Sequence, residues 1–266
     1  MQDVMDTDAA KRIGIAAAYK GGQVLRAHFG KVLKIDKKGP TDLVTEADRQ
    51  SEKAIIETIR AAFPEHAVLA EESGMSAGAR DIRWYIDPLD GTTNFAHGLN
   101  LFCVSIACAV DGDIALGIVL GPLTDELFVA VKGQGATRNG RSIRVSNTRS
   151  VSESLLVTGF PYDSEKDHFP IIRRFSNCLK VAQGIRRLGS AALDLCYLAC
   201  GRFAGYWEQN LHPWDTAAGF LIAKESGAEV TDFSNAAFSV DKPELLATNG
   251  KIHDEMLMLL KIEDRT

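Results

Sequence analysis

The first quarter of the chain carries apolar side chains at helical spacing. One stripe has members at i, i+1, i+4, i+7 and i+8, namely Ile55, Ile56, Ile59, Ala62 and Phe63. This spacing predicts a helix that begins at Thr45 or Ala47. An earlier alanine-rich segment predicts a helix over about 8–29, with Asp6 or Asp8 as its N-cap.

The rest of the chain mixes short apolar runs with turn residues and further helical patterns. Asp111-Gly112 separates two of the longest runs, which is a strong signal for a hairpin turn. Strands are predicted at 66–70, 83–87, 102–110, 114–121, 127–131, 136–138, 155–159 and 203–208. Helices are predicted at 168–179, 191–199, 213–226 and 252–260.

Helices and strands therefore occur in blocks, with hairpins in each half. This pattern predicts an α+β fold with layered helices and largely antiparallel sheets, rather than a repeating βαβ order. A boundary near Asn147 divides the chain into an N-terminal lobe, 1–146, and a C-terminal lobe, 147–266. We expect the first lobe to bind metal and phosphate, the second to form the substrate pocket, and both to make one structural unit.

Composition narrows the possible partners. The 266 residues include 30 basic and 35 acidic side chains, for a net charge of −5, which argues against broad, direct nucleic-acid binding. An acidic protein that binds an anionic substrate needs a metal ion or a concentrated positive site. The five cysteines lack a Cys-x-x-Cys pair, which fits a reducing compartment. With no signal-like start and no long apolar run, we expect a cytoplasmic protein without membrane contact.

The densest candidate chemistry is a set of acidic residues. Glu71 and Glu72 end a predicted strand, Asp87 and Asp90 flank Pro88-Leu89, and Asp215 begins a predicted helix. Such carboxylates, brought together, would raise one another's pKa unless cations balanced them. Oxygen ligands suit Mg²⁺, Mn²⁺ or Ca²⁺ rather than zinc, and a pair of ions about 4 Å apart suits phosphoryl transfer. Taken singly, each aspartate equally fits an ordinary turn or helix cap.

The segment around Pro88 suits that chemistry. The proline forces a turn, so that the aspartates on either side face one point, and the Leu89 carbonyl is a further oxygen ligand. Gly91 admits close backbone approach, and a helix starting here would point its first N–H groups, through that of Thr93, at a phosphate. Thr92 can share a proton with a nearby carboxylate, for which Asp48 is the candidate.

Four segments resemble the inositol monophosphatase family, in particular its bacterial branch. The first family signature is similar to 84–95, WYIDPLDGTTNF, and the second to 212–219, HPWDTAAG. Two further blocks, 42–48 and 71–74, follow the family order. The resemblance extends from about residue 10 to 260.

The resemblance implies a five-layered αβαβα sandwich, a homodimer, inhibition by lithium, and Mg²⁺ as cofactor with two to three ions per subunit. By position, Glu71, Asp87 and the Leu89 carbonyl would hold the first ion, and Asp87, Asp90 and Asp215 the second. Glu71 would also support a weaker third ion. Asp48 and Thr92 would orient and deprotonate the attacking water, and Gly91 with Thr92 would bind phosphate.

The same resemblance places a substrate pocket in the second half. Glu208 would accept hydrogen bonds from inositol hydroxyls, beside a loop formed by Gly189, Ser190 and Ala191, while Asp90 and Asp215 would also contact the substrate. Glu208 equally fits a solvated charge at a strand end, and the Arg186-Arg187 pair fits either an anion site or an exposed surface.

The resulting hypothesis is a Mg²⁺-dependent phosphomonoesterase that releases inositol and phosphate from inositol monophosphate by metal-activated water. Related substrates are alternatives: fructose 1,6-bisphosphate, histidinol phosphate or 3′-phosphoadenosine 5′-phosphate. A different class of alternative is a dimeric protein-binding scaffold in which catalysis is secondary.

Overall fold

The structure is a computed structural model that describes residues 6–31, 35–37, 43–76, 78–161 and 169–262. Its helices are α1 (Thr7–His28), α2 (Glu46–Ala62), α3 (Thr92–Ala96), α4 (Phe169–Leu179), α5 (Ala191–Ala199), α6 (Pro213–Glu225) and α7 (His253–Leu260). A 3₁₀ turn covers Val151–Glu153. Within the described part of the chain, no helix combines the length and the apolar character that crossing a membrane requires.

Two sheets form the framework. The larger has eight strands in the order β10-β9-β8-β7-β6-β5-β3-β4, and the smaller has five in the order β12-β11-β13-β15-β14. The strands of the larger sheet are β3 (His66–Ala70), β4 (Gly74–Ser76), β5 (Ala79–Asp90), β6 (Cys103–Val110), β7 (Asp113–Gly121), β8 (Glu126–Val131), β9 (Ala136–Arg138) and β10 (Arg141–Ser142). Those of the smaller are β11 (Leu155–Thr158), β12 (Gly184–Arg186), β13 (Gly205–Gln209), β14 (Glu229–Thr231) and β15 (Glu244–Thr248). A separate ribbon pairs β1 (Ile35–Lys37) with β2 (Leu43–Thr45).

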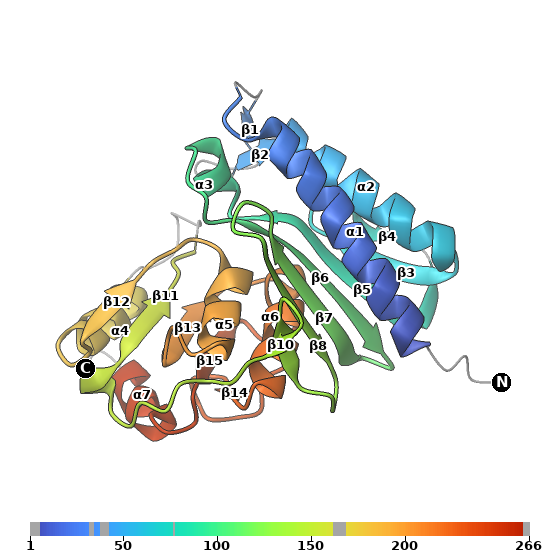
Figure 1. The fold of residues 1–266 in the computed structure, drawn as a ribbon. Coiled ribbons are helices and arrows are strands. Elements are labelled where there is room, and N and C mark those ends of the chain that lie inside the picture. Colours follow the sequence, from blue (N-terminus) through green and yellow to red (C-terminus); the bar gives the residue numbers. More distant parts are fainter. Residues whose placement is uncertain (1–5, 32–34, 38–42, 77, 162–168, 263–266) are drawn as a thin grey trace.

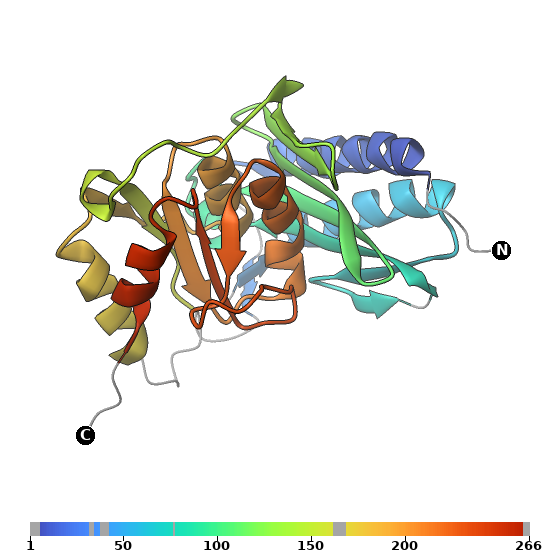
Figure 2. The same cartoon turned by 90° about the horizontal axis from the view of Figure 1, so that it is seen from below.

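The layers alternate from one side of the molecule to the other (Figures 1 and 2). Helices α1 and α2 cover one face of the larger sheet, α5 and α6 lie between the sheets, and α4 and α7 cover the far face of the smaller sheet. Alternation along β5 explains the two-sided burial, because Trp84 and Ile86 pack toward α1 and α2 whereas Tyr85 packs toward α5 and α6. The predicted α+β class and αβαβα layering are confirmed.

Close contact between α6 and the larger sheet depends on a glycine. A Cβ atom at Gly117 in β7 would lie 2.6 Å from the backbone oxygen of Ala218 in α6. The absent side chain lets the helix lie directly on the sheet, and the start of that helix carries Asp215. Sheet packing thereby positions a candidate ligand.

Several predicted elements differ in detail from the structure. Strand β5 is longer than predicted and continues past Pro88, with a register irregularity between Asp87 and Asp90. Pairing is mainly antiparallel, but β3 and β5 are parallel, and β11 is parallel to both of its neighbours. Seven short strands were not predicted, because such segments become strands only through pairing: β1, β2, β4, β10, β12, β14 and β15. The division of the lobes at residue 147 stays a prediction.

Candidate active site

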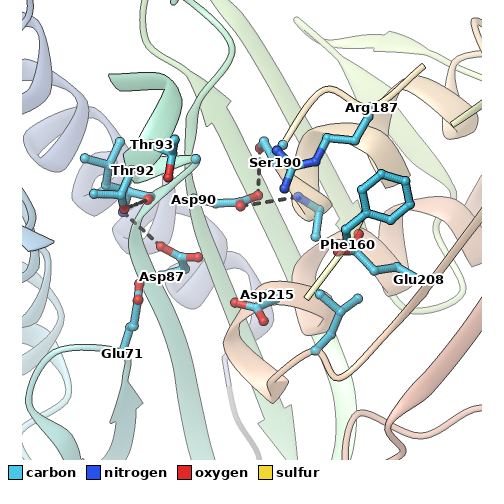
Figure 3. Close-up of a pocket in the computed structure, with 15 residues that line it drawn as sticks. Glu71, Asp87, Asp90, Thr92, Thr93, Phe160, Arg187, Ser190, Glu208 and Asp215 are labelled. Atoms are coloured by element: carbon cyan, nitrogen blue, oxygen red, sulfur yellow. Dashed lines mark hydrogen bonds between the residues drawn. The ribbon is translucent and has the colours of Figure 1, made fainter. Parts of the chain in front are cut away.

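A pocket opens where the larger sheet, the smaller sheet and the helices between them meet (Figure 3). Its walls are formed by Glu71, Asp87, Leu89, Asp90, Gly91, Thr92, Thr93, Phe160, Arg187, Gly189, Ser190, Ala191, Glu208, Leu211 and Asp215. Every residue that the sequence analysis placed at the metal or substrate site is in this set. Asp48 is absent from it and lies behind Thr92.

The turn at the end of β5 is fixed by local hydrogen bonds. The Leu89 N–H donates to Asp87 Oδ1 at 2.9 Å, and the Thr92 hydroxyl lies 3.0 Å from the Leu89 carbonyl oxygen. From α2, the Ser51 hydroxyl donates to the Pro88 carbonyl at 3.0 Å. These contacts hold the Asp87 carboxylate and the Leu89 carbonyl at one end of the pocket.

Asp48 belongs to the start of α2. Its Oδ2 accepts hydrogen bonds from the Thr45 N–H at 2.8 Å and the Thr45 hydroxyl at 2.6 Å, which makes Asp48 part of a capping box. Its Oδ1 lies 3.1 Å from the Thr92 hydroxyl, so the predicted contact between these two side chains is confirmed. Burial raises the pKa of Asp48. Because Asp48 does not line the pocket, its carboxylate is connected to the pocket through the Thr92 hydroxyl.

Asp90 is held by the first turn of α5. Its Oδ2 accepts from the Ser190 hydroxyl and the Ala192 N–H, each at 2.7 Å, and its Oδ1 accepts from the Ala191 N–H at 3.3 Å. Behind it, the Cys103 thiol lies 3.7 Å from Oδ2. Ser190 is only 2% exposed, and its hydroxyl donates to Asp90 instead of facing solvent.

Gly91 allows two loops to meet beside the turn that ends β5. Its φ of +100° is in the left-handed region, and a Cβ there would lie 2.9 Å from the Leu101 oxygen and 3.3 Å from the Gly189 oxygen. Asn94 joins the same loops, because its Nδ2 donates to the carbonyls of Leu101 at 2.6 Å and Leu188 at 2.8 Å. Any side chain at position 91 would separate them.

The remaining acids come from the later part of the chain. Asp215 Oδ2 accepts from the His212 N–H at 2.7 Å at the start of α6. Glu208, on β13, accepts from the Tyr206 hydroxyl at 2.7 Å. Figure 3 shows Glu71 and Asp87 at one side of the pocket and Glu208 with Phe160 and Arg187 at the other.

Burial and mutual repulsion make these acids hard to ionise. The pKa of Asp87, which is 3% exposed, is raised well above its usual range by burial and then by the charges of Glu71, Asp90 and Asp215. Burial also raises the pKa of Asp215 and, against the hydrogen bonds from Ser190 and Ala192, that of Asp90. The pKa of Glu208 is raised to about 7 by burial, which the Tyr206 hydroxyl and the Arg187 charge partly offset.

Comparison with known proteins identifies the family to which the chain belongs. A sequence model described as the inositol monophosphatase family matches residues 6–263. The chain belongs to the inositol monophosphatase family. The inositol-1-monophosphatase of Synechocystis sp. is 46% identical to it over 250 residues, which are 93% of this chain and 87% of the relative. The Nus factor SuhB of Pseudomonas aeruginosa is 40% identical over 256 residues, 94% of each protein.

Structural comparison agrees. The crystal structure of extragenic suppressor protein suhB from Bartonella henselae matches with a TM-score of 0.92 and 39% identity, covering 96% of this chain and 100% of that one. The family resemblance inferred from the sequence is therefore confirmed. Membership in the inositol monophosphatase family makes the chain an enzyme, a phosphoric monoester hydrolase.

The inositol monophosphatase family is generally metal-dependent, and the donor set here fits a hard cation. Glu71, Asp87, Asp90, Asp215 and the Leu89 carbonyl offer only oxygen, and the raised pKa of the buried acids calls for a compensating positive charge. Among the residues that the structure describes, no three His, Cys, Asp or Glu side chains already form a compact ligand group. Asp90 and Asp215 instead direct oxygens to backbone N–H groups.

The sequence analysis named the backbone N–H of Thr93 as a candidate phosphate contact, but it gave no pocket role to Phe160 and Leu211 and no definite one to Arg187. Arg187 was noted only as half of a basic pair, yet Figure 3 shows its side chain beside Glu208 and Phe160. Its position two residues before Gly189 was the available signal, but the direction of a loop side chain depends on tertiary packing.

Proposed function

We propose that the chain is a Mg²⁺-dependent phosphomonoesterase that hydrolyses inositol monophosphate to inositol and phosphate. The observation that carries this proposal is the set of carboxylate and carbonyl oxygens that line one pocket, next to the hydrogen bond between Thr92 and Asp48. When bound, Mg²⁺ supplies the Lewis acidity that activates water and stabilises negative charge on the transferred phosphate and the leaving oxygen.

The proposed metal ligands fall into two overlapping sets. Glu71, Asp87 and the Leu89 carbonyl are assigned to one ion, and Asp87, Asp90 and Asp215 to a second, with two to three ions per subunit. Asp87 suits the shared position because its pKa is raised first by burial and then by the charges of all three neighbouring acids, Glu71, Asp90 and Asp215.

The proposed proton transfer uses Asp48 and Thr92, with Glu71 as a further catalytic carboxylate. The Thr92 oxygen takes a proton from the attacking water while its own proton passes to Asp48, 3.1 Å away. Burial raises the pKa of Asp48, which makes the ionised carboxylate a stronger base. The backbone N–H groups of Gly91 and Thr92 are assigned to the phosphate.

Glu208 and the loop of Gly189, Ser190 and Ala191 are assigned to the alcohol part of the substrate, with Asp90 and Asp215 between them and the phosphate. A carboxylate suits a polyol because it accepts several O–H bonds, and it repels a second phosphate. Arg187 lines the same side of the pocket as Glu208, and its positive charge would instead favour a substrate with a second phosphate. Fructose 1,6-bisphosphate, histidinol phosphate and 3′-phosphoadenosine 5′-phosphate are therefore included as competing substrates.

Phosphate release from inositol 1-phosphate, measured across a Mg²⁺ titration, tests the proposal. Wild-type protein should require Mg²⁺ and Asp90→Asn should lose nearly all activity. Asp113→Asn is a matched control, because Asp113 is exposed and forms a surface salt bridge with Lys132. Preference for a bisphosphate by tenfold or more in kcat/KM would discard the inositol assignment and keep the mechanism.

We further propose that the protein is a cytoplasmic homodimer that lithium inhibits, as its family resemblance implies. Lithium inhibition is read in the same assay, and the dimer by light scattering of the purified chain.

A second candidate is a non-catalytic role, favoured by the relatives that carry the name Nus factor SuhB. An inactive Asp87→Asn variant separates the two roles. Growth of a deletion strain restored by that variant would support the scaffold reading, whereas restoration by wild type alone would support catalysis.

A further inference from the structure

Gly159 directly follows β11, and Glu208 lies on the neighbouring strand β13. Strands β11 and β13 run parallel, with Val157 opposite Tyr206 and Thr158 opposite Trp207. The next pair in this register is Gly159 and Glu208, and the Thr158 hydroxyl donates to the Trp207 carbonyl at 2.7 Å just before it. Residues 159 and 208 therefore present their side-chain positions to the same face of the sheet, where the pocket lies.

The Glu208 carboxylate occupies the space that a side chain at position 159 would need. A Cβ atom on Gly159 would lie 2.0 Å from each carboxylate oxygen of Glu208 and 2.1 Å from its Cδ. No comparably placed atom of the backbone is among the nearest neighbours. A side chain at 159 and the present position of the Glu208 carboxylate exclude each other.

Backbone conformation does not require glycine here. Gly159 has no positive φ, in contrast to Gly91 and Gly189 of the same site. The three atoms nearest to an alanine Cβ at 159 would all belong to the Glu208 carboxylate, which is the flexible end of a long side chain. Rotation of Glu208 would relieve the clash, but Glu208 would lose the hydrogen bond from the hydroxyl of Tyr206, a fully buried residue.

We propose that Gly159 determines substrate specificity: its missing side chain makes the space in which the Glu208 carboxylate stands to receive the hydroxyl groups of a polyol phosphate. This inference rests on the proposed function, in which Glu208 contacts the polyol. Gly159 acts through Glu208 and is a positioning residue. Phe160, the next residue, lines the pocket itself, so the strand end and the pocket wall are continuous.

The test compares two monoesters in Gly159→Ala: inositol 1-phosphate and phenyl phosphate, which has no hydroxyl for Glu208 to read. We expect KM for inositol 1-phosphate to rise roughly tenfold, the loss of about one hydrogen bond to a charged group. KM for phenyl phosphate should remain unchanged. In a Glu208→Ala background, which has no carboxylate to displace, Gly159→Ala should have no further effect on either KM.

Gly184→Ala is the matched control, since Gly184 is on β12, the other neighbour of β11, and a Cβ there would lie 3.3 Å from its nearest neighbour, Cδ1 of Leu155. If Glu208→Ala raises KM for inositol 1-phosphate and Gly159→Ala does not, the inference is overturned and the proposed function stands. If Glu208→Ala leaves that KM unchanged, the assignment of Glu208 to the polyol and the inference about Gly159 both fail, while the phosphatase proposal is decided separately by the Mg²⁺ titration. If Gly159→Ala unfolds the protein, recovery of folding in the double variant supports the inference, and unfolding of the double variant overturns it.

Discussion

The Ser190 hydroxyl donates a 2.7 Å hydrogen bond to Oδ2 of Asp90 and thereby joins the end of β5 to the start of α5 at the active site. Asp90 ends β5 of the larger sheet, and Ser190 precedes α5, which packs between the two sheets. The Ala192 N–H donates to the same oxygen at the same distance, so two donors fix one carboxylate oxygen. Asp90 can then offer its other oxygen to the pocket in a defined direction.

Removal of this hydroxyl should weaken metal binding without unfolding the enzyme. In Ser190→Ala, Asp90 keeps the Ala192 N–H but loses the side-chain donor, and loss of such a supporting contact costs roughly 10–100-fold in metal affinity. We expect the Mg²⁺ concentration for half-maximal activity to rise by about tenfold. Ser152→Ala, which removes an exposed hydroxyl, should behave as wild type. An unchanged Mg²⁺ titration for Ser190→Ala would show that Asp90 needs no such support.

The hydrogen bond between Thr92 and Asp48 leads to a second prediction. Asp48→Asn keeps an oxygen to cap α2 but removes the base, so kcat should fall by roughly 10²–10⁴-fold while the melting temperature changes little. Glu46→Gln alters a neighbouring acid of the same helix turn and should retain activity. If Asp48→Asn lost activity only in proportion to lost folded protein, the carboxylate would be a helix cap and nothing more.

Glu208 predicts a pH dependence of substrate recognition. Its pKa is raised to about 7 by burial, so the side chain is mostly protonated below that pH and loses acceptor capacity for hydroxyl groups. The ratio of KM for inositol 1-phosphate to KM for phenyl phosphate should therefore rise as pH falls from 8 to 6. Taking the ratio cancels the ionisation of the phosphate itself. Glu208→Gln should give a flat ratio, and a flat ratio in the wild type would contradict the assignment.

Local sequence predicted much of the site because local chemistry builds it. The turn at Asp87-Pro88-Leu89-Asp90 is closed by contacts within the segment, such as that of the Leu89 N–H with Asp87. The contact of Thr92 with Asp48 was also anticipated, although 44 positions separate them. Amphipathic periodicity likewise located the long helices, because one buried face repeats every turn.

The features that were missed depend on packing between distant segments. The place of Arg187 in the pocket follows from the path of the loop before α5, and β15 becomes a strand by pairing with β13. The importance of Gly159 also has no local signal, since it needs neither a turn nor a positive φ. The role of Gly159 can be recognised only in the folded structure, where the Glu208 carboxylate occupies the space that a side chain at 159 would need.

Asp194 is a buried acid that the proposed chemistry does not use. It lies in α5, is 1% exposed, and neither carboxylate oxygen has a hydrogen-bond partner among the described residues. Burial raises its pKa well above the usual range, and the charges of Glu208 and Asp90 raise it further. The folded state is therefore more stable when the Asp194 carboxyl is neutral than when it is ionised.

This placement predicts that Asp194→Asn stabilises the protein at higher pH. Because the folded-state pKa is raised, protonation of Asp194 favours folding, and this contribution is complete below the unfolded pKa of about 3.9. It is lost as pH rises toward the folded pKa, at up to about 1.4 kcal/mol per pH unit, whereas asparagine does not titrate. Urea unfolding at pH 5, 7 and 9 should show a growing advantage of Asp194→Asn over wild type. Asp241→Asn, which alters an exposed acid, should follow the wild type; no advantage for Asp194→Asn at any pH would mean that the carboxylate is compensated in solution.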